Sequence, residues 1–480
     1  TVSLDYSATG TPMAVSVTNT GSLTATFFSG SAPLNITNPA TTTFNLALGS
    51  GADTLSLAAV FNGGLIQGNV GDDTFNIYAN FTGTVRGGSG NNILNFMNTN
   101  SGVSNFDGGG TASVYAAVTR NNNFTITGSG AGNLNTLLQT NFSNVTSVRG
   151  GIFADRFTFL DGSSLAGTVD GGAGQDVLTF ENFGASRVLQ TTFTTACGGT
   201  VNLLQPGNTT GSVGVIGNFA ALESIIGGQG DDSFLFGNSG SIAGGIDGGL
   251  GNNTLDYRNY TPSSSTGVNV NLLTGAGTLI GGAASGRISR IRDIYGTAMN
   301  DSLTGDSQNN ILYGMAGNDN LAGNDGNDML IGGMGSDTVQ GGNGYNIQIG
   351  NEINFTVGGP VTGGYGIAGQ YYDFVLRSMM ACLSTASTGS SADNAYNQIE
   401  NLGVIVYIPG SSTQYGVQLY AANLSLTGNG TVFNDGVFDR VVVSSVNQDW
   451  VFYTTSPSSE ADLVVNLANA RRRSIANRKV

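Results

Sequence analysis

Glycine recurs at a fixed spacing of nine residues in the middle of this chain. It stands at positions 296, 305, 314, 323, 332, 341 and 350. A globular core is assembled from elements of unequal length and does not keep such a period, whereas a stack of identical short coils does. The spacing therefore predicts an all-β fold, a parallel β-solenoid or β-roll with glycine-rich turns.

Each nine-residue unit combines a six-residue turn with a three-residue strand. The units read GTAMNDSLT, GDSQNNILY, GMAGNDNLA, GNDGNDMLI, GGMGSDTVQ and GGNGYNIQI. The eighth position is aliphatic until the last unit, with Leu303, Leu312, Leu321, Leu330, Val339 and then Gln348. One inward side chain per unit implies that two units complete a flattened coil, and that coils stack at about 4.8 Å.

These units resemble the hemolysin-type, or RTX, calcium-binding repeat, whose consensus is GGxGxD-x-aliphatic-x. The resemblance implies a β-roll in which sixth-position side chains and turn carbonyls of neighbouring coils share calcium ions. It marks as candidate metal ligands the sixth-position residues and four turn glycines, namely Asp301, Asp319, Asp328, Asp337, Asn310, Asn346, Gly314, Gly317, Gly332 and Gly335.

The charges of the roll support a cation independently of the resemblance. Residues 296–350 contain six Asp and no Glu, Lys or Arg, and like charges stacked at coil spacing repel each other unless a cation lies between them. Because successive units alternate, we expect Asp301, Asp319 and Asp337 on a first edge that binds calcium. The second edge would hold Asn310, Asp328 and Asn346, with amides bonding along the stack and Asp306 and Asp325 adding charge. The alternative is that Asp and Asn merely close glycine-rich turns.

Upstream of the roll, the same turn recurs once per coil rather than twice. It begins at residues 48, 68, 87, 108, 128, 150 and 171 and again at 227 and 248, with degenerate copies at 108 and 128. Its eighth positions include Phe75, Phe157 and Phe234, which we expect to fill a wider core. The candidate calcium ligands here are Asp73, Asp155, Asp176 and Asp232, although Arg149 or Arg156 could neutralise their charge instead.

Composition divides the chain into four parts. Residues 1–47 alternate apolar and polar positions, which predicts strands that cap or dock on the solenoid end. The solenoid of coils of about 20 residues covers 48–295 and the roll covers 296–350. We expect 351–480 to be a separate β domain ending in a basic helical tail, either solvated or docked on an acidic neighbour.

Net charge and residue usage exclude several classes of function. A net charge of −15 argues against nucleic acid and anionic membranes as partners. No apolar run is long enough to span a bilayer, and Thr1 predicts a processed or partial chain, which favours export. Histidine is absent, so histidine-based catalysis is excluded, and the prediction is that the protein is not an enzyme.

The sequence therefore predicts an extracellular, calcium-binding structural protein that self-assembles with copies of itself into a filament or surface layer. Its acidic, His-free, Lys-poor composition also resembles that of bacterial surface-layer proteins. One alternative is a secreted adhesin that binds cell-surface glycans through residues 351–480. A further alternative is a β-helix polysaccharide lyase or epimerase, which can work with calcium, a carboxylate and an arginine base, and so does not need histidine.

Overall fold

The computed structural model describes residues 44–350, apart from 49–50, 58–59, 117–119, 136–137, 185–187 and 205–212. Outside that range it describes only short strands and two helical residues, Leu376 and Met380. Among the described residues, no helix is long and apolar enough to cross a membrane.

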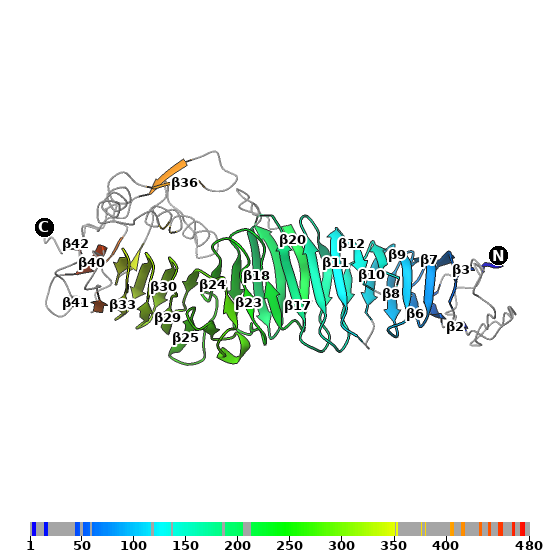
Figure 1. The fold of residues 1–480 in the computed structure, drawn as a ribbon, viewed down its shortest axis with the longest axis horizontal. Helices are drawn as coiled ribbons and strands as arrows, with labels where there is room; N and C mark the ends of the chain where they lie inside the picture. The colour runs from blue at the N-terminus through cyan, green and yellow to red at the C-terminus, as the bar shows by residue number, and fades with distance from the viewer. Residues whose placement is uncertain are drawn as a thin grey trace.

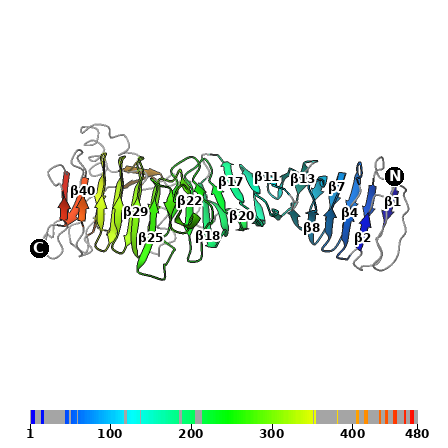
Figure 2. The same ribbon diagram turned by 60° about the horizontal axis from the view of Figure 1, so that its bottom comes forward.

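The described strands form an elongated stack that runs from the N-terminal to the C-terminal end of the molecule (Figures 1 and 2). The chain passes back and forth between two faces, and each coil adds a strand parallel to the one before. Sheet 1 forms one face of the upstream coils, sheet 3 takes over that side in the roll, and sheet 2 forms the other face throughout.

In sheets 1 and 3, the spatial order of the strands follows the chain order except around two hairpins. Sheet 1 contains β1 (Val2–Asp5), β3 (Phe44–Ala47), β5 (Gly64–Gln67), β7 (Asn80–Arg86), β9 (Gly102–Asp107), β13 (Thr140–Ser143), β12 (Ala131–Leu134), β11 (Asn123–Gly128), β15 (Arg156–Leu160), β17 (Val177–Asn182), β21 (Ser224–Ile226), β23 (Ile246–Asp247) and β27 (Ile288–Ser289). Sheet 3 contains β26 (Ala276–Gly277), β25 (Thr266–Asn271), β29 (Asn300–Thr304), β31 (Asn320–Ala322), β33 (Thr338–Gln340), β39 (Arg440–Val442) and β41 (Leu463–Val465).

The order of the strands in sheet 2 is given by which strands pair with each other. It contains β2 (Ala14–Val17), β4 (Thr54–Leu57), β6 (Thr74–Ile77), β8 (Asn91–Phe96), β10 (Thr111–Tyr115), β14 (Ser147–Arg149), β16 (Leu165–Asp170), β20 (Val213–Ala220), β19 (Gly198–Leu204), β18 (Val188–Thr195), β22 (Ser233–Phe236), β24 (Thr254–Asp256), β28 (Asp293–Tyr295), β30 (Ile311–Ala316), β32 (Met329–Met334), β34 (Ile347–Ile349), β40 (Trp450–Thr454) and β42 (Arg471–Ile475). A short 3-10 helix spans Gly281–Ala283, and β35 (Glu352–Ile353) pairs with β38 (Val432–Phe433) and β36 (Val404–Tyr407) with β37 (Gln414–Val417).

The strand register confirms the predicted coil lengths. In the roll, Leu303 pairs with Leu321 and Leu312 with Leu330, so one coil is two nine-residue units. In the upstream coils Leu55 pairs with Phe75, which is a step of 20 residues. The two predicted periods are therefore both present.

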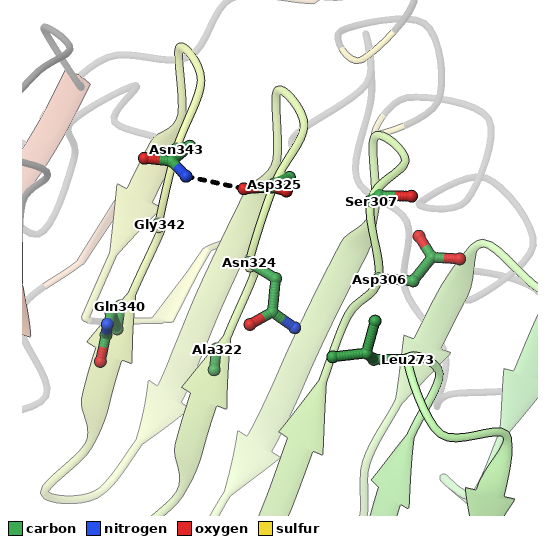
Figure 3. A pocket seen from close by; sticks show the side chains of 9 residues that line it. All are labelled: Leu273, Asp306, Ser307, Ala322, Asn324, Asp325, Gln340, Gly342 and Asn343. Carbon is green, nitrogen blue, oxygen red and sulfur yellow. Dashed lines mark hydrogen bonds between the residues drawn. The ribbon is translucent and has the colours of Figure 1, made fainter.

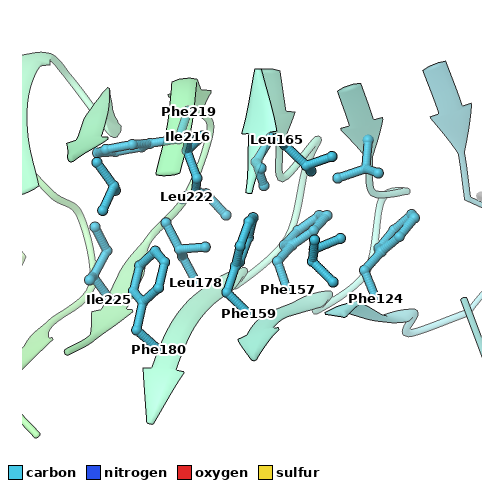
Figure 4. Packing of buried hydrophobic residues seen from close by; sticks show 14 of the residues in the cluster. Phe124, Phe157, Phe159, Leu165, Leu178, Phe180, Ile216, Phe219, Leu222 and Ile225 are labelled. Carbon is cyan, nitrogen blue, oxygen red and sulfur yellow. The ribbon is translucent and has the colours of Figure 1, made fainter. Parts of the chain in front are cut away.

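A single continuous core lies between the two faces. The predicted eighth-position aliphatics of the roll are all fully buried, as are the upstream phenylalanines. Figure 4 shows side chains of both faces meeting in the core, and within sheet 1 the rings of Phe124 and Phe157, on the neighbouring strands β11 and β15, stack 5.0 Å apart. The expectation that these phenylalanines fill the core is confirmed.

Two antiparallel insertions interrupt the stack. In sheet 1, β12 lies antiparallel between β11 and β13, and in sheet 2, β19 lies antiparallel between β18 and β20. The prediction of a solenoid turn at residue 128 is therefore wrong, because that glycine-rich segment is the tip of the β11–β12 hairpin. The strands on either side still pair in parallel with the neighbouring coils.

The described C-terminal strands differ from the expected separate domain. Strand β39 pairs in parallel with β33 and β40 with β34, and β41 and β42 add a further layer. These strands continue the roll, and two of them occupy the segment for which a helical tail was expected. Apolar residues spaced three or four apart imitated a helix there, but stacking on an existing sheet edge favours a strand. At the other end, β1 and β2 pair with β3 and β4 and extend the stack.

Candidate metal centre

The sixth-position side chains of the first edge form a buried ladder. The backbone N–H of Asp301 donates to Oδ1 of Asp319 at 2.7 Å, and that of Asp319 donates to Oδ1 of Asp337 at 2.8 Å. All three side chains are at most 3 % exposed. The predicted first edge is therefore present, and each carboxylate bridges to the coil before it.

The second edge carries an equivalent ladder built partly from amides. The N–H of Asn310 donates to Oδ1 of Asp328 at 2.9 Å, and the N–H of Asp328 donates to Oδ1 of Asn346 at 2.7 Å. The amide of Asn310 also donates to the carbonyl of Arg292 at 2.9 Å. Asparagine side chains bond along this stack as expected.

The upstream turns repeat the arrangement in pairs. The N–H of Asp73 donates to Asn92, that of Asp155 to Asp176, and that of Asp232 to Asn253, at 3.1, 2.7 and 2.8 Å. Each predicted pair of turns is thus a pair of direct neighbours.

Sequence reasoning missed two acidic members of the upstream ladders. Asp53 donates its N–H to Asp73 Oδ1 at 2.9 Å, and Asp176 donates its N–H to Glu223 Oε2 at 2.8 Å. Asp53 stood at the sixth position of a recognised turn, so the motif could have identified it. Glu223 lies just before β21 outside any turn motif, and only the fold brings it into line.

Hydrogen bonding to the second carboxylate oxygen distinguishes two groups among six of the predicted aspartates. In Asp73, Asp176 and Asp319, Oδ1 accepts an N–H from the preceding coil, while the buried Oδ2 has no hydrogen-bond partner. We call these three the open aspartates. Buried carboxylate oxygens normally have donors, so an oxygen left without one is available to a cation.

Three other predicted ligands have both oxygens occupied by the protein. Asp301 accepts N–H groups from Val268 and Thr297, each at 2.6 Å, and Asp155 and Asp232 accept donors in the same way. We call these three the closed aspartates. They close their turns as the alternative interpretation expects.

Burial favours the neutral form of these carboxyl groups and therefore raises their pKa. It raises the pKa of Asp319 to about 8, against the hydrogen bond from Asp301, with Asp337 and Asp301 adding repulsion. It also raises the pKa of Asp176 to about 7 and of Asp73 to about 6. Burial likewise raises the pKa of Asp301 to about 6, partly offset by its backbone hydrogen bonds. A buried carboxylate with a raised pKa is stabilised by a nearby cation.

The arginines that might have neutralised the upstream turns are engaged elsewhere. Arg149 pairs with Asp170 and Arg156 pairs with Glu181, both at 3.1 Å on partly exposed surface. Burial raises the pKa of the Asp155 carboxyl, and the positive charge of Arg120 offsets only part of that rise. Arg149 and Arg156 therefore do not neutralise Asp73 or Asp176.

The first-position glycines lie against a carboxylate oxygen and a carbonyl oxygen, at open and closed aspartates alike. A Cβ added at Gly314 would collide with both Asp319 Oδ2 and the carbonyl oxygen of Gly332 in the next coil. The same pairing of carboxylate and carbonyl surrounds Gly68 at Asp73 and Gly171 at Asp176. Two acceptors held close together repel each other unless a cation, or a proton on the carboxyl group, compensates them.

The fourth-position glycines allow the coils to approach. Gly317 and Gly335 have φ of +113° and +126°, and a Cβ at Gly335 would collide with the carbonyl of Gly317. Of the four predicted glycines, Gly314 and Gly332 therefore line the oxygen cradle, and Gly317 and Gly335 permit the stacking that forms it.

The remaining turn carboxylates lie outside the ladders. Asp72 and Asp231 each accept an exposed N–H from the next coil at 2.7 Å. Asp306 and Asp325 line a shallow groove along the second edge, where Asn343 donates to Asp325 at 2.7 Å (Figure 3). None of these four carboxylates belongs to a buried ladder.

The donor set is made of oxygen atoms only. Carboxylate and backbone carbonyl oxygens suit a hard cation such as Ca²⁺, which takes six to eight oxygen ligands. In the described part of the chain, no three His, Cys, Asp or Glu side chains converge as a metal cluster. A cation between two neighbouring coils would therefore be bound by one or two carboxylates and by carbonyl oxygens of the turns.

Comparison with known families agrees with this chemistry. Residues 295–330 and 313–347 match the family model described as the RTX calcium-binding nonapeptide repeat, four copies of it. The matched stretches cover the roll almost entirely, and repeats of this family bind calcium. A comparison with curated proteins gives no match.

Proposed function

Because residues 295–347 carry RTX calcium-binding nonapeptide repeats, we propose that the chain is an extracellular structural protein whose roll becomes rigid on binding calcium and which then assembles into a filament or surface layer. The observation that carries the proposal is the pair of buried ladders running unbroken through the roll at both edges. Repeats of this family are typical of secreted proteins, which supports the location.

Calcium would be held by the open aspartates rather than by every predicted ligand. At the first edge, Asp319 Oδ2 and the carbonyl of Gly332 would face the ion, and Asp337 continues the same ladder. In the wider coils, Asp73 and Asp176 would serve with the carbonyls of Gly87 and Ala221. The closed aspartates Asp301, Asp155 and Asp232 would support the turns. The bound ion supplies positive charge that compensates buried carboxylates.

Calcium concentration would then act as the signal for folding. Extracellular calcium modules bind with Kd of about 10⁻⁴ to 10⁻³ M, so they stay empty in a cytosol and fill outside a cell. At a free concentration of ten times Kd, each site adds about 1.4 kcal/mol to the free energy of unfolding. A few such sites are comparable with the whole stability of a domain.

The shape of the molecule supports self-assembly. Among the described strands, β1 and β2 at one end and β41 and β42 at the other each pair with one neighbour only. A strand edge of this kind is a template for another strand. Contacts between unlike ends of identical subunits produce open filaments when they do not close into rings.

Electron microscopy of the purified protein tests this function. The expected result is ordered filaments or sheets at millimolar calcium that disperse on addition of a chelator. A protein that stays monomeric in light scattering at high concentration with calcium present would contradict the assembly.

The other hypotheses receive no specific support. The adhesin hypothesis placed glycan binding in a separate C-terminal domain, whereas β39–β42 stack on the roll. The lyase or epimerase hypothesis stays a prediction, which an assay for uronate cleavage tests.

A further inference from the structure

Sheet 2 is buried on both of its faces in the last upstream coils and in the roll. Every residue of β24, β28 and β34 is buried, as are the first five residues of β32. In the same coils, the strands of sheet 3 alternate between buried and accessible positions, as β29 and β31 show. Alternation marks a sheet with one face in water, and continuous burial marks a sheet covered on both sides. Something therefore covers the outer face of sheet 2.

The sequence of the roll contains the same asymmetry. The units on sheet 2 place apolar residues on both sides of the inward position, as in Ile311–Leu312–Tyr313 and Met329–Leu330–Ile331. The units on sheet 3 place polar or small residues there, as in Ser302, Thr304 and Gln340. The apolar residues therefore follow a period of eighteen residues within the nine-residue repeat. The family consensus is the same for the units of both sheets and does not contain this longer period.

These outward residues form a second apolar layer, separate from the main core. We call it the outer stripe; its members are at most 7 % exposed, and they are Tyr295, Ile311, Tyr313, Met329, Ile331, Ile347 and Ile349. Tyr295 and Tyr313 meet edge to face at 6.3 Å. At one end of the stripe, the guanidinium of Arg258 lies 4.5 Å over the Tyr295 ring and pairs with Asp256 at 2.6 Å. In the strand register, Ile347 at the other end of the stripe pairs with Trp450 of β40.

We propose that the outer stripe is a docking platform for the segment of this chain that carries Leu376 and Met380. These two residues are helical and only 1 % and 8 % exposed, yet they belong to no part of the main core. Residues four apart on a helix share one face. The surrounding sequence, DFVLRSMMACL at 373–383, supplies further apolar side chains for such a contact.

Chain connectivity favours the molecule's own segment over an outside partner. Leu376 lies 23 residues after Ile353, the end of β35, so a tether of that length joins the segment to the stripe. A short tether gives an effective concentration of about millimolar, which a separate protein seldom reaches. The occupant of the outer stripe is thus a segment of the same chain.

Docking couples the segment to calcium, and this step rests on the proposed function. The stripe exists as a continuous surface only when coils of the roll stack. Filling the roll with calcium would create the platform and seat the segment, while an unfolded roll would release it. The segment would cover an apolar patch that would otherwise promote aggregation.

Trypsin cleavage after Arg377, beside Leu376, measures the docked state in the full chain. We compare Ile331→Glu, which places a charge in the stripe, with Gln340→Glu, the exposed ninth position of the next unit on sheet 3. Leu376→Asp disrupts the contact from the other side and leaves the roll untouched, which guards against misfolding of the first variant. Terbium titration of every variant reports whether the roll still binds cations.

The expected result in calcium is slow cleavage in the wild type and in Gln340→Glu. Cleavage should be at least about tenfold faster in Ile331→Glu and Leu376→Asp, since local opening exposes the bond. Unchanged cleavage in Leu376→Asp would overturn the proposal, as would a calcium-loaded dimer in which two copies exchange segments. Loss of terbium binding in the wild type would contradict the proposed function instead, because docking is judged from the cleavage rates alone.

Discussion

Asp319 and Asp301 occupy the same position in consecutive coils of the first edge, yet their carboxylates meet different partners. The difference comes from position two of each turn. Thr297 donates both its N–H and its hydroxyl to Asp301, at 2.6 and 3.0 Å. Met315 stands at the corresponding position beside Asp319, with φ of +82°. The backbone conformation at the second position of the turn thus distinguishes the closed Asp301 from the open Asp319.

Replacing these two residues by asparagine should give opposite results. In D319N, one oxygen still accepts the N–H of Asp301, but the negative charge is lost. We expect the chelated protein to keep or gain stability and the stabilisation by calcium to fall by about 1–2 kcal/mol. In D301N, an amide N–H would face the N–H of Thr297, and stability should fall by about 1–3 kcal/mol with or without calcium.

Thermal melts of both variants, with calcium and with chelator, make this comparison. Equal loss of calcium stabilisation in the two variants would contradict the division into open and closed aspartates.

The raised pKa values predict the dependence on pH. Without calcium, the folded state holds protons on Asp319, Asp176 and Asp73 up to about pH 8, 7 and 6, whereas the unfolded chain releases them near 3.8. Their contribution is therefore fully present below about pH 4 and is lost as pH rises through 6 to 8.

Calcium should reverse this trend, because metal ligands must be deprotonated. The difference in melting temperature between calcium and chelator should widen from pH 5 to pH 8. In D319N the part of this widening above pH 7 should shrink. A difference that is constant with pH would show that these carboxylates do not bind the ion.

At the scale of the single turn, fourth-position glycine does more than relieve backbone strain. Gly335 has a positive φ and also lies against the carbonyl of Gly317, whereas Gly63 has φ of +101° and open space around it. A substitution at either position introduces the strain of an L-residue at positive φ, about 1–3 kcal/mol. Only Gly335 adds a collision between coils.

The Gly335→Ala variant should therefore lose about 1–3 kcal/mol more than Gly63→Ala. Urea unfolding of the two variants measures the difference. Equal losses would show that coil spacing at the first edge adapts to the extra methyl group.

The elements that repeat were predictable, and those that do not repeat were not. The nine-residue period identified the roll, the residues on each of its two edges, and the inward Leu303 and Leu321. The hairpin at residue 128 escaped prediction because its glycines serve an antiparallel turn as well as a solenoid turn. The C-terminal segment was expected to be rich in β structure, but the pairing of β39 and β40 with the roll escaped prediction because their partners lie far away in sequence. Strands β41 and β42 escaped because their apolar spacing resembles that of a helix.

Side-chain detail within the candidate site was also beyond the motif. The sequence placed Asp301 and Asp319 as equals, since both occupy position six of similar units. Their difference depends on donors from Thr297 and Val268, and Val268 reaches the ladder only through the pairing of β25 with β29. Ligands defined by a repeat can thus be predicted as a set and ranked only in three dimensions.

The described coils form a rod with one continuous apolar core, along which the proposed cation sites are unevenly spaced. Open aspartates occur at Asp73 before β6, Asp176 before β17 and Asp319 before β31, in turns that lie many strands apart in the stack. Calcium would thus fix the rod at intervals, while the core and the ladders hold the coils between. A net charge of −15 resists compaction until cations bind.

Hydrogen exchange of residues 296–350, with calcium and with chelator, tests the central claim most directly. We predict strong protection of the ladder N–H groups of Asp301 and Asp319 in calcium and at least about tenfold faster exchange under chelation. Identical protection in the two conditions would show that the ladders need no metal and would contradict a roll that calcium makes rigid.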